Sequence, residues 1–247
     1  MQPTPHHLRE TLSYAEIHET LVTGTRPIYF QENADTPIWG AGTLFVAQWE
    51  DMQFAITAKH ALNNCGANPK HTRLLFPGYK VALPISGALT FSLPKHETRE
   101  ELEDIFIFKI DHKSDMDGEE LEWYAWNMSR FWKPASKLEQ GQQIFAVGFP
   151  STDDRYDWKK QKVNERPLIA VGMLGTNDFG DGIYTIDCAE FECDLSGISG
   201  GPVFARFDGL FHYIGMIIRG GAEAKKIHFI DSIYITFVLN ESAKSSN

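Results

Sequence analysis

The sequence predicts an all-β protein built from two antiparallel six-stranded β-barrels. Apolar runs of strand length, bounded by turn residues, fall into two sets of about six. The first set covers residues 42–49, 53–58, 72–76, 80–85, 88–93 and 104–110, and the second covers 143–149, 167–174, 183–192, 202–207, 211–218 and 226–238. Six strands suffice for one barrel, so each set predicts one barrel.

An N-terminal extension, a linker and a tail complete the predicted organisation. The barrels span about 38–112 and 138–240, within one domain of 38–240, and the other parts are 1–37, 113–137 and 241–247. The extension is expected to be helical and packed on a barrel, with Thr4 as its cap. A docking or regulatory arm is the alternative. Met128 and Trp132 continue a helical spacing that predicts a connecting helix in the linker, and the polar tail is expected to fray.

Composition limits the classes of partner. The chain has 247 residues, a formal net charge of −10 and a pI near 5.4, which argue against nucleic acid or an anionic membrane as a partner. No apolar run approaches the roughly 18 residues of a membrane span. The first residues lack a signal core, and three cysteines form no disulfide framework, so a reduced, cytoplasmic protein is expected. Metal-binding and phosphate-binding motifs are absent, so no cofactor is expected.

The string Gly197-Ile198-Ser199-Gly200-Gly201 is the strongest functional signal. Glycines lack a side chain, so they permit a sharp turn and a close approach of backbone amides. A serine nucleophile needs both, because its hydroxyl must project and N–H groups must face the oxygen that gains charge in acyl transfer. The motif predicts Ser199 as a nucleophile. A glycine-rich turn between strands is the alternative.

Two further motifs supply a base and its orienting partner. One apolar run ends at Thr57-Ala58-Lys59-His60, and another begins at Asp104. A serine hydroxyl needs a base within hydrogen-bond reach, and the base must be oriented. A carboxylate that leads a buried strand is costly unless it is paired, and a histidine N–H would pair it. Glu101 and Glu103 are rivals of Asp104, and a buried structural role is the alternative for His60.

In this order, His60, Asp104 and Ser199 resemble the catalytic triad of the chymotrypsin-like (trypsin-like) serine peptidases. The resemblance covers about residues 38–238 and includes Gly40-x-Gly42 and the run 146–150. It implies that Ser199 attacks the scissile carbonyl and that His60 transfers the proton. Asp104 would hold the imidazole tautomer, and the amides of Gly197 and Ser199 would form the oxyanion hole. With reduced cysteines, the chain resembles bacterial intracellular trypsin-like domains more than it resembles disulfide-stapled secreted relatives.

The resemblance also implies where a substrate binds. Ile218, Arg219 and Gly220 would form the edge strand that pairs with an extended peptide. Cys193 and Asp194 fall where the primary pocket is lined, and the Asp194 carboxylate would favour Lys or Arg before the scissile bond. A solvated loop aspartate is the alternative. Ile198 stands where secreted members carry the aspartate that pairs with a freshly cut N-terminus, so activation by such cleavage is not expected.

The sequence therefore predicts a cytoplasmic serine endopeptidase that acts on proteins or peptides through a covalent acyl-enzyme. A regulatory protein partner in a bacterial stress or defence system would gate it, because an unregulated cytosolic protease is hazardous. The alternative is a catalytically inactive peptide-binding module on the same fold.

Overall fold

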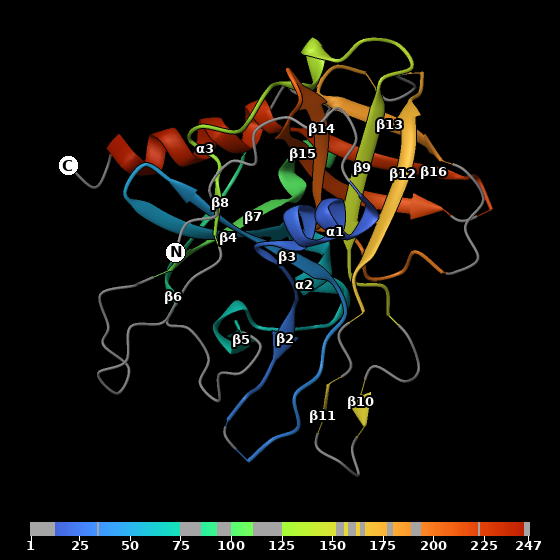
Figure 1. Cartoon of the computed structure of the whole chain (residues 1–247). Coiled ribbons are helices and arrows are strands. Elements are labelled where there is room, and N and C mark those ends of the chain that lie inside the picture. Colours follow the sequence, from blue (N-terminus) through green and yellow to red (C-terminus); the bar gives the residue numbers. More distant parts are fainter. Residues whose placement is uncertain are drawn as a thin grey trace.

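Strands dominate the chain, and helices are few (Figure 1). The computed structural model describes residues 13–33, 35–74, 85–92, 100–110, 125–151, 156–157, 162–163, 166–176, 180–188, 194–221 and 223–244. Two groups of strands follow one another along the sequence, one from each half of the chain, as the sequence predicts.

The second half forms a closed six-stranded antiparallel barrel. Its strands, in order around the barrel, are β12 (Leu168–Leu174), β13 (Ile183–Cys188), β16 (Lys226–Asp231), β15 (Leu210–Gly221), β14 (Pro202–Phe207) and β9 (Gln143–Gly148). Alternate side chains along these strands point inward, because the side-chain period of a strand is two residues. Ile144, Val203, Ile217 and Phe229 belong to the resulting buried core. The barrel predicted for 138–240 is confirmed.

The first half forms a six-stranded sheet. Its path runs β1 (Thr25–Pro27), β3 (Thr43–Trp49), β4 (Met52–Ala58), β7 (Ile105–Ile110) and β6 (Ile85–Thr90), with β8 (Trp126–Asn127) parallel to β3. A two-stranded sheet pairs β2 (Tyr29–Phe30) with β5 (Thr72–Arg73). Among the described strands this sheet does not close on itself, so the first predicted barrel is seen only as a sheet. Residues 80–84 of a predicted strand lie outside the described residues.

Both faces of the first sheet are buried at its central strands β3, β4 and β7, and one of them packs against the barrel. Phe45, Phe54 and Ile107 lie in a cluster that also contains Phe204 and Tyr213 from the barrel. The rings of Phe45 and Tyr213 are stacked with centroids 5.2 Å apart. Aromatic pairs contribute about 0.5–1.5 kcal/mol beyond their area burial. The two halves therefore share one continuous apolar core.

Helix α1 (Tyr14–Val22) lies in the predicted extension of residues 1–37. Ser13 caps it: the Ser13 hydroxyl accepts from the Glu16 amide, and the Glu16 carboxylate accepts from the Ser13 amide. This reciprocal pair satisfies two donors that the first helical turn leaves open. Leu21 and Val22 pack on the core, in line with the prediction of a packed helix. The predicted cap Thr4 lies outside the described residues.

The predicted connecting helix is wrong in the described part of the linker, 125–137. There the chain forms β8 and the short 3₁₀ turn η3 (Ala135–Lys137). Met128 is fully buried, and Trp132 packs on Trp49 with ring centroids 6.2 Å apart. The helical spacing of these side chains arose because each fills the seam between sheet and barrel. It does not reflect a helical backbone.

Helix α3 (Ser232–Lys244) replaces the second half of the predicted strand 226–238 and extends into the predicted tail. Its buried positions include Ile235, Val238 and Leu239, at helical spacing. In Figure 1 this red helix runs from the barrel across the edge of the first sheet, and it packs on β15, β16 and β6. The indole N–H of Trp49 donates to Asn240 over 3.2 Å. The helix thus joins the two halves. No helix in the described residues is long and apolar enough to cross a membrane.

Asp231 fixes the start of α3. Its Oδ1 atom accepts from the amides of Ile233 and Ala135, each over 3.0 Å, so it also holds η3 against the helix. Burial raises the pKa of the Asp231 carboxyl above its ordinary value of 3.8, and the hydrogen bonds only partly oppose this. The folded state therefore binds this proton more tightly than the unfolded state does. Stability falls as pH rises through the window above 3.8.

An Asp231→Asn variant is expected to be at least as stable as the wild type at pH 7. Asparagine keeps the Oδ1 acceptor but carries no charge to desolvate. Its advantage should shrink as pH falls toward 4, where the wild-type carboxyl becomes protonated. Urea unfolding at pH 7 and pH 4 measures both values, and a variant that is clearly less stable at pH 7 would contradict this account.

Candidate active site

The structure brings His60 and Asp104 together in a doubly hydrogen-bonded pair. The His60 ring atom Nδ1 lies 2.6 Å from Asp104 Oδ2, and the His60 backbone N–H donates to Asp104 Oδ1 over 2.8 Å. The carboxylate can only accept, so the proton lies on Nδ1 and the lone pair on Nε2. The Asp104 side chain is 16% exposed and that of His60 35%. This pairing leaves a basic ring nitrogen at a partly open surface.

Local structure explains why the pair forms. His60 is the second residue of helix α2 (Lys59–Asn64), which follows β4 directly, and the N-cap Ala58 has no side chain that could accept. Asp104 ends the 3₁₀ turn η2 (Glu100–Asp104), one residue before β7, which pairs with β4. The carboxylate therefore reaches the open first turn of α2 and takes over the capping role that alanine cannot fill.

The serine loop lies against the same corner of the first sheet. The Thr43 amide, at the start of β3, donates to the Ser199 carbonyl over 2.9 Å. A Cβ atom placed on Gly42 would lie 3.0 Å from the Cβ atom of Ala61 in α2 and 3.9 Å from the Ser199 carbonyl oxygen. The serine loop and helix α2, which carries His60, therefore both lie next to Gly42. All three predicted triad residues lie in this corner.

In the described structure the Ser199 hydroxyl donates to the Ile218 carbonyl over 3.1 Å and makes no hydrogen bond with His60. Nucleophilic catalysis needs the hydroxyl to turn toward the basic nitrogen, and such bonds are often loose before substrate binds.

In the serine loop, most backbone groups make hydrogen bonds with other described residues, but the N–H groups of Gly197 and Ser199 do not. Four successive carbonyls accept hydrogen bonds: Ser196 from the Ser151 amide, Gly197 from the Thr43 hydroxyl, Ile198 from the Gly201 amide and Ser199 from the Thr43 amide. Four nearby amides donate within the protein: Ser196, Ile198, Gly200 and Gly201. Within the described part of the chain, the Gly197 and Ser199 amides donate to nothing.

The paired carbonyls also orient the two open amides. A trans peptide points its C=O and the following N–H in opposite directions. The Ser196 carbonyl faces Ser151, so the Gly197 N–H points away from that side. The Ile198 carbonyl faces Gly201, so the Ser199 N–H points away from Gly201. Open, fixed N–H groups beside a serine are suited to stabilise an oxyanion.

Gly197 is required where it stands. Its φ angle is +93°, at the third position of a turn closed by the Ile198 amide on the Leu195 carbonyl. A type II turn needs a positive φ at that position, which glycine adopts without strain. A Cβ atom there would also lie 2.9 Å from the Phe149 carbonyl oxygen.

Ile198 anchors the loop by apolar packing. It is 2% exposed, and a Cβ atom on Gly148 would lie 2.7 Å from the Ile198 Cβ atom. The Ile198 Cδ1 atom also approaches Gly220. The position that the resemblance assigns to an activating ion pair is therefore filled by an aliphatic side chain in the core, which needs no charged N-terminus to hold it.

Asp194 lies five residues before Ser199, at the start of a described segment. Its side chain is exposed, and Oδ1 accepts from the Ser196 amide over 3.0 Å. Hydrogen bonds from Ser196 lower the pKa of the Asp194 carboxyl. An exposed side chain with a local hydrogen bond is what the solvated-loop alternative describes, and the role of Asp194 in a substrate pocket stays a prediction. Cys193, its neighbour in the predicted pocket, lies outside the described residues.

The predicted substrate edge is the last part of β15. Pairing of β15 with β14 ends at Met216, but β15 continues beside β16 as far as Gly221. A bulge at Ile218 separates the paired residues Ile217 and Arg219. Ile218 is buried, Arg219 is exposed and Gly220 is half-buried. Among the described strands, this part of β15 therefore has one partner as it runs past the serine, as an edge that accepts a peptide requires.

Two threonines at this site had no role in the sequence prediction. Thr43 is fully buried, and its carbonyl accepts from the Thr57 hydroxyl over 2.7 Å. Thr57 lies in the predicted Thr-Ala-x-His motif, but nothing in the motif indicated its partner. The one sequence signal for a role of Thr43 was that a polar residue begins an otherwise apolar strand.

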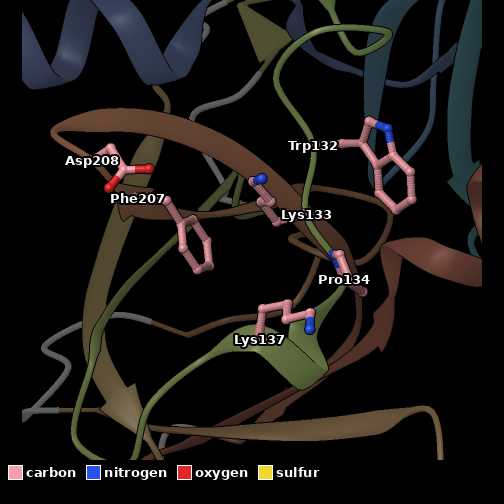
Figure 2. A pocket seen from close by; sticks show the side chains of 6 residues that line it. All are labelled: Trp132, Lys133, Pro134, Lys137, Phe207 and Asp208. Carbon is pink, nitrogen blue, oxygen red and sulfur yellow. The ribbon is translucent and has the colours of Figure 1, made fainter.

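A separate hollow of about 550 Å³ lies on the barrel side of the linker (Figure 2). Trp132, Lys133, Pro134, Lys137, Phe207 and Asp208 line it. Both lysines are exposed, and none of these residues belongs to the site above. Across the described residues, no group of three or more His, Cys, Asp or Glu side chains could hold a metal ion.

No model of a known protein family matches the chain, and a search of curated proteins found no relative.

Proposed function

We propose that this protein is a serine endopeptidase with a chymotrypsin-like two-barrel fold, in which Ser199, His60 and Asp104 form the triad. One observation carries the proposal: a His60–Asp104 pair, joined through Nδ1 of the ring, lies in the same corner as Ser199 and the open amides of Gly197 and Ser199. The resemblance of the sequence motifs to those of chymotrypsin-like peptidases also supports the proposal. The arrangement combines a base, an orienting carboxylate and an oxyanion site.

In the proposed reaction, Ser199 Oγ bonds to the scissile carbonyl carbon while its proton moves to His60 Nε2. The carbonyl oxygen takes up the charge and binds the Gly197 and Ser199 amides. The C–N bond then breaks, and His60 returns the proton to the leaving amine. Water, activated by His60 in turn, hydrolyses the acyl-enzyme and frees Ser199. Removing one oxyanion donor from such a site costs about 10²–10³ in kcat.

The Ser199–Ile218 hydrogen bond favours a second candidate, a peptide-binding module without turnover. In that reading the serine hydroxyl stays on the Ile218 carbonyl, and the β15 edge binds an extended peptide. A regulatory partner that turns the hydroxyl toward His60 would convert one state into the other. The reduced, cytoplasmic setting predicted from the sequence is part of this proposal.

A fluorophosphonate probe separates the two candidates. We expect the full-length protein to be labelled at one site and the Ser199→Ala variant to remain unlabelled. Ser196→Ala is the matched control, because it removes a nearby exposed hydroxyl and should leave labelling intact. A folded wild type that resists the probe, alone and with a bound peptide, would favour the non-catalytic module.

A further inference from the structure

Thr43 makes three hydrogen bonds to the second half of the chain, through its hydroxyl and its amide, and two of them hold the serine loop. Its hydroxyl donates to the Gly197 carbonyl over 2.8 Å and accepts from the Phe149 amide over 2.8 Å. Its amide donates to the Ser199 carbonyl over 2.9 Å. The side chain comes from the first sheet, whereas its partners come from the second half of the chain. One buried threonine thus bridges the two halves at the site.

The Thr43 hydroxyl holds a carbonyl of the serine loop, whereas the neighbouring carbonyls accept hydrogen bonds from backbone amides. The carbonyls of Ser196, Ile198 and Ser199 are held by amides, and within the described chain the Gly197 carbonyl is held by a side chain. The two peptides that meet at Gly197 are therefore held at one carbonyl by Ser151 and at the other by Thr43. Loss of the hydroxyl removes the hydrogen bond at the carbonyl of the second peptide, which is then held through the Ile198 N–H that donates to the Leu195 carbonyl. It also leaves the buried Phe149 amide unpaired.

We propose that Thr43 is a positioning residue whose hydroxyl fixes the Gly197–Ile198 peptide. That peptide links the two peptides that carry the open N–H groups of Gly197 and Ser199, so Thr43 sets how these groups are oriented relative to each other. This inference rests on the proposed function, because it assigns those N–H groups to the oxyanion. It also makes the first sheet, which supplies His60 and Asp104, a determinant of the oxyanion site in the second half. Thr43 touches no reacting atom.

The test compares Thr43→Val, which keeps the shape but lacks the hydroxyl, with Thr43→Ser, which keeps the hydroxyl. With p-nitrophenyl acetate as substrate, we expect Thr43→Val to lower kcat by about 10–100-fold, less than the loss of a donor itself. KM should change by no more than about twofold, because the N–H acts on the transition state. Thr43→Ser should retain most of the activity. The pH profile of kcat should not move, since the His60–Asp104 pair is untouched.

Thr236→Val is the matched control. Thr236 is also buried, and its hydroxyl donates to the Ile233 carbonyl over 3.0 Å within α3. Its loss should leave kcat unchanged. If Thr43→Val does not fold, Thr43→Cys keeps a weaker donor and should show a smaller fall in kcat. The amide NMR signal of Gly197 is expected to shift in either variant, whatever the turnover.

Three results would overturn the inference: an unchanged kcat and Gly197 signal in folded Thr43→Val, an equal loss in Thr43→Ser, or a displaced pH profile. Each of these leaves the proposed function standing if the wild type turns over substrate. A wild type that is inert to both ester and fluorophosphonate refutes the proposed function itself, and the Gly197 signal still reports on Thr43.

Discussion

An Asp104→Asn variant is expected to lose about 10⁴-fold in kcat while it keeps its fold. The asparagine Oδ1 atom can still accept from the His60 backbone N–H, so the start of α2 stays capped. Its NH₂ group, however, faces Nδ1 and can only donate. Nδ1 must then accept, the proton moves to Nε2, and the ring cannot take the proton of Ser199.

Single-turnover acylation by an activated ester measures this loss without the complication of product release. Glu101→Gln is the control: it removes a charge from the same 3₁₀ turn, η2, and should leave the rate within about twofold. A rate in Asp104→Asn close to that of the wild type would show that Asp104 does not orient the base. A Glu101→Gln variant with the larger loss would move that role to the rival carboxylate.

A Gly200→Ala variant is expected to lose about 3 kcal/mol or more of its free energy of unfolding. Gly200 has a φ angle of +88°, which strains any residue with a side chain. An added Cβ atom would also overlap the Thr43 carbonyl oxygen and the Thr57 hydroxyl, and would lie 2.9 Å from the Ala58 amide nitrogen. These are atoms of paired strands that cannot move aside.

Gly180→Ala separates the two causes. Gly180 has nearly the same φ angle, +86°, but no atom lies within 4 Å of an added Cβ. Urea unfolding should show the cost of backbone strain alone, about 1–2 kcal/mol, at Gly180, and strain plus overlap at Gly200. Equal losses in the two variants would mean that the loop does not pack on β3 and β4 as described.

Much of the strand pattern could be predicted from the sequence, because apolar runs bounded by turns define strands in both halves. The runs at 42–49, 53–58 and 202–207 correspond to β3, β4 and β14 within a residue or so. Helix α3 could not be predicted in the same way. Its segment Ile233-Tyr234-Ile235-Thr236-Phe237 is rich in residues that favour strands. Packing on β15 and β6 and the cap at Asp231 override that local preference.

The candidate site also has a part that could be predicted from the sequence and a part that could not. The pairing of His60 with Asp104 follows from chemistry, since a buried carboxylate needs a donor, and the sequence offered both residues. The second bond, from the Asp104 carboxylate to the His60 amide, depends on where η2 ends relative to α2 and has no sequence signal. Thr43 lies more than 150 residues from the carbonyl that it holds. A contact of that range follows from the packing of the two halves, which no local pattern encodes.

Helix α3 has a consequence for the timing of synthesis. The strand that frames the serine, β15, and the helix that ties the barrel to Trp49 and Phe91 both follow Ser199 in the chain. When Ser199 is added to the chain during synthesis, β15 and α3 have not yet been made. The nascent chain then lacks the two elements that hold the serine loop near His60. Assembly of the proposed site therefore waits until β15 and α3 have been synthesised.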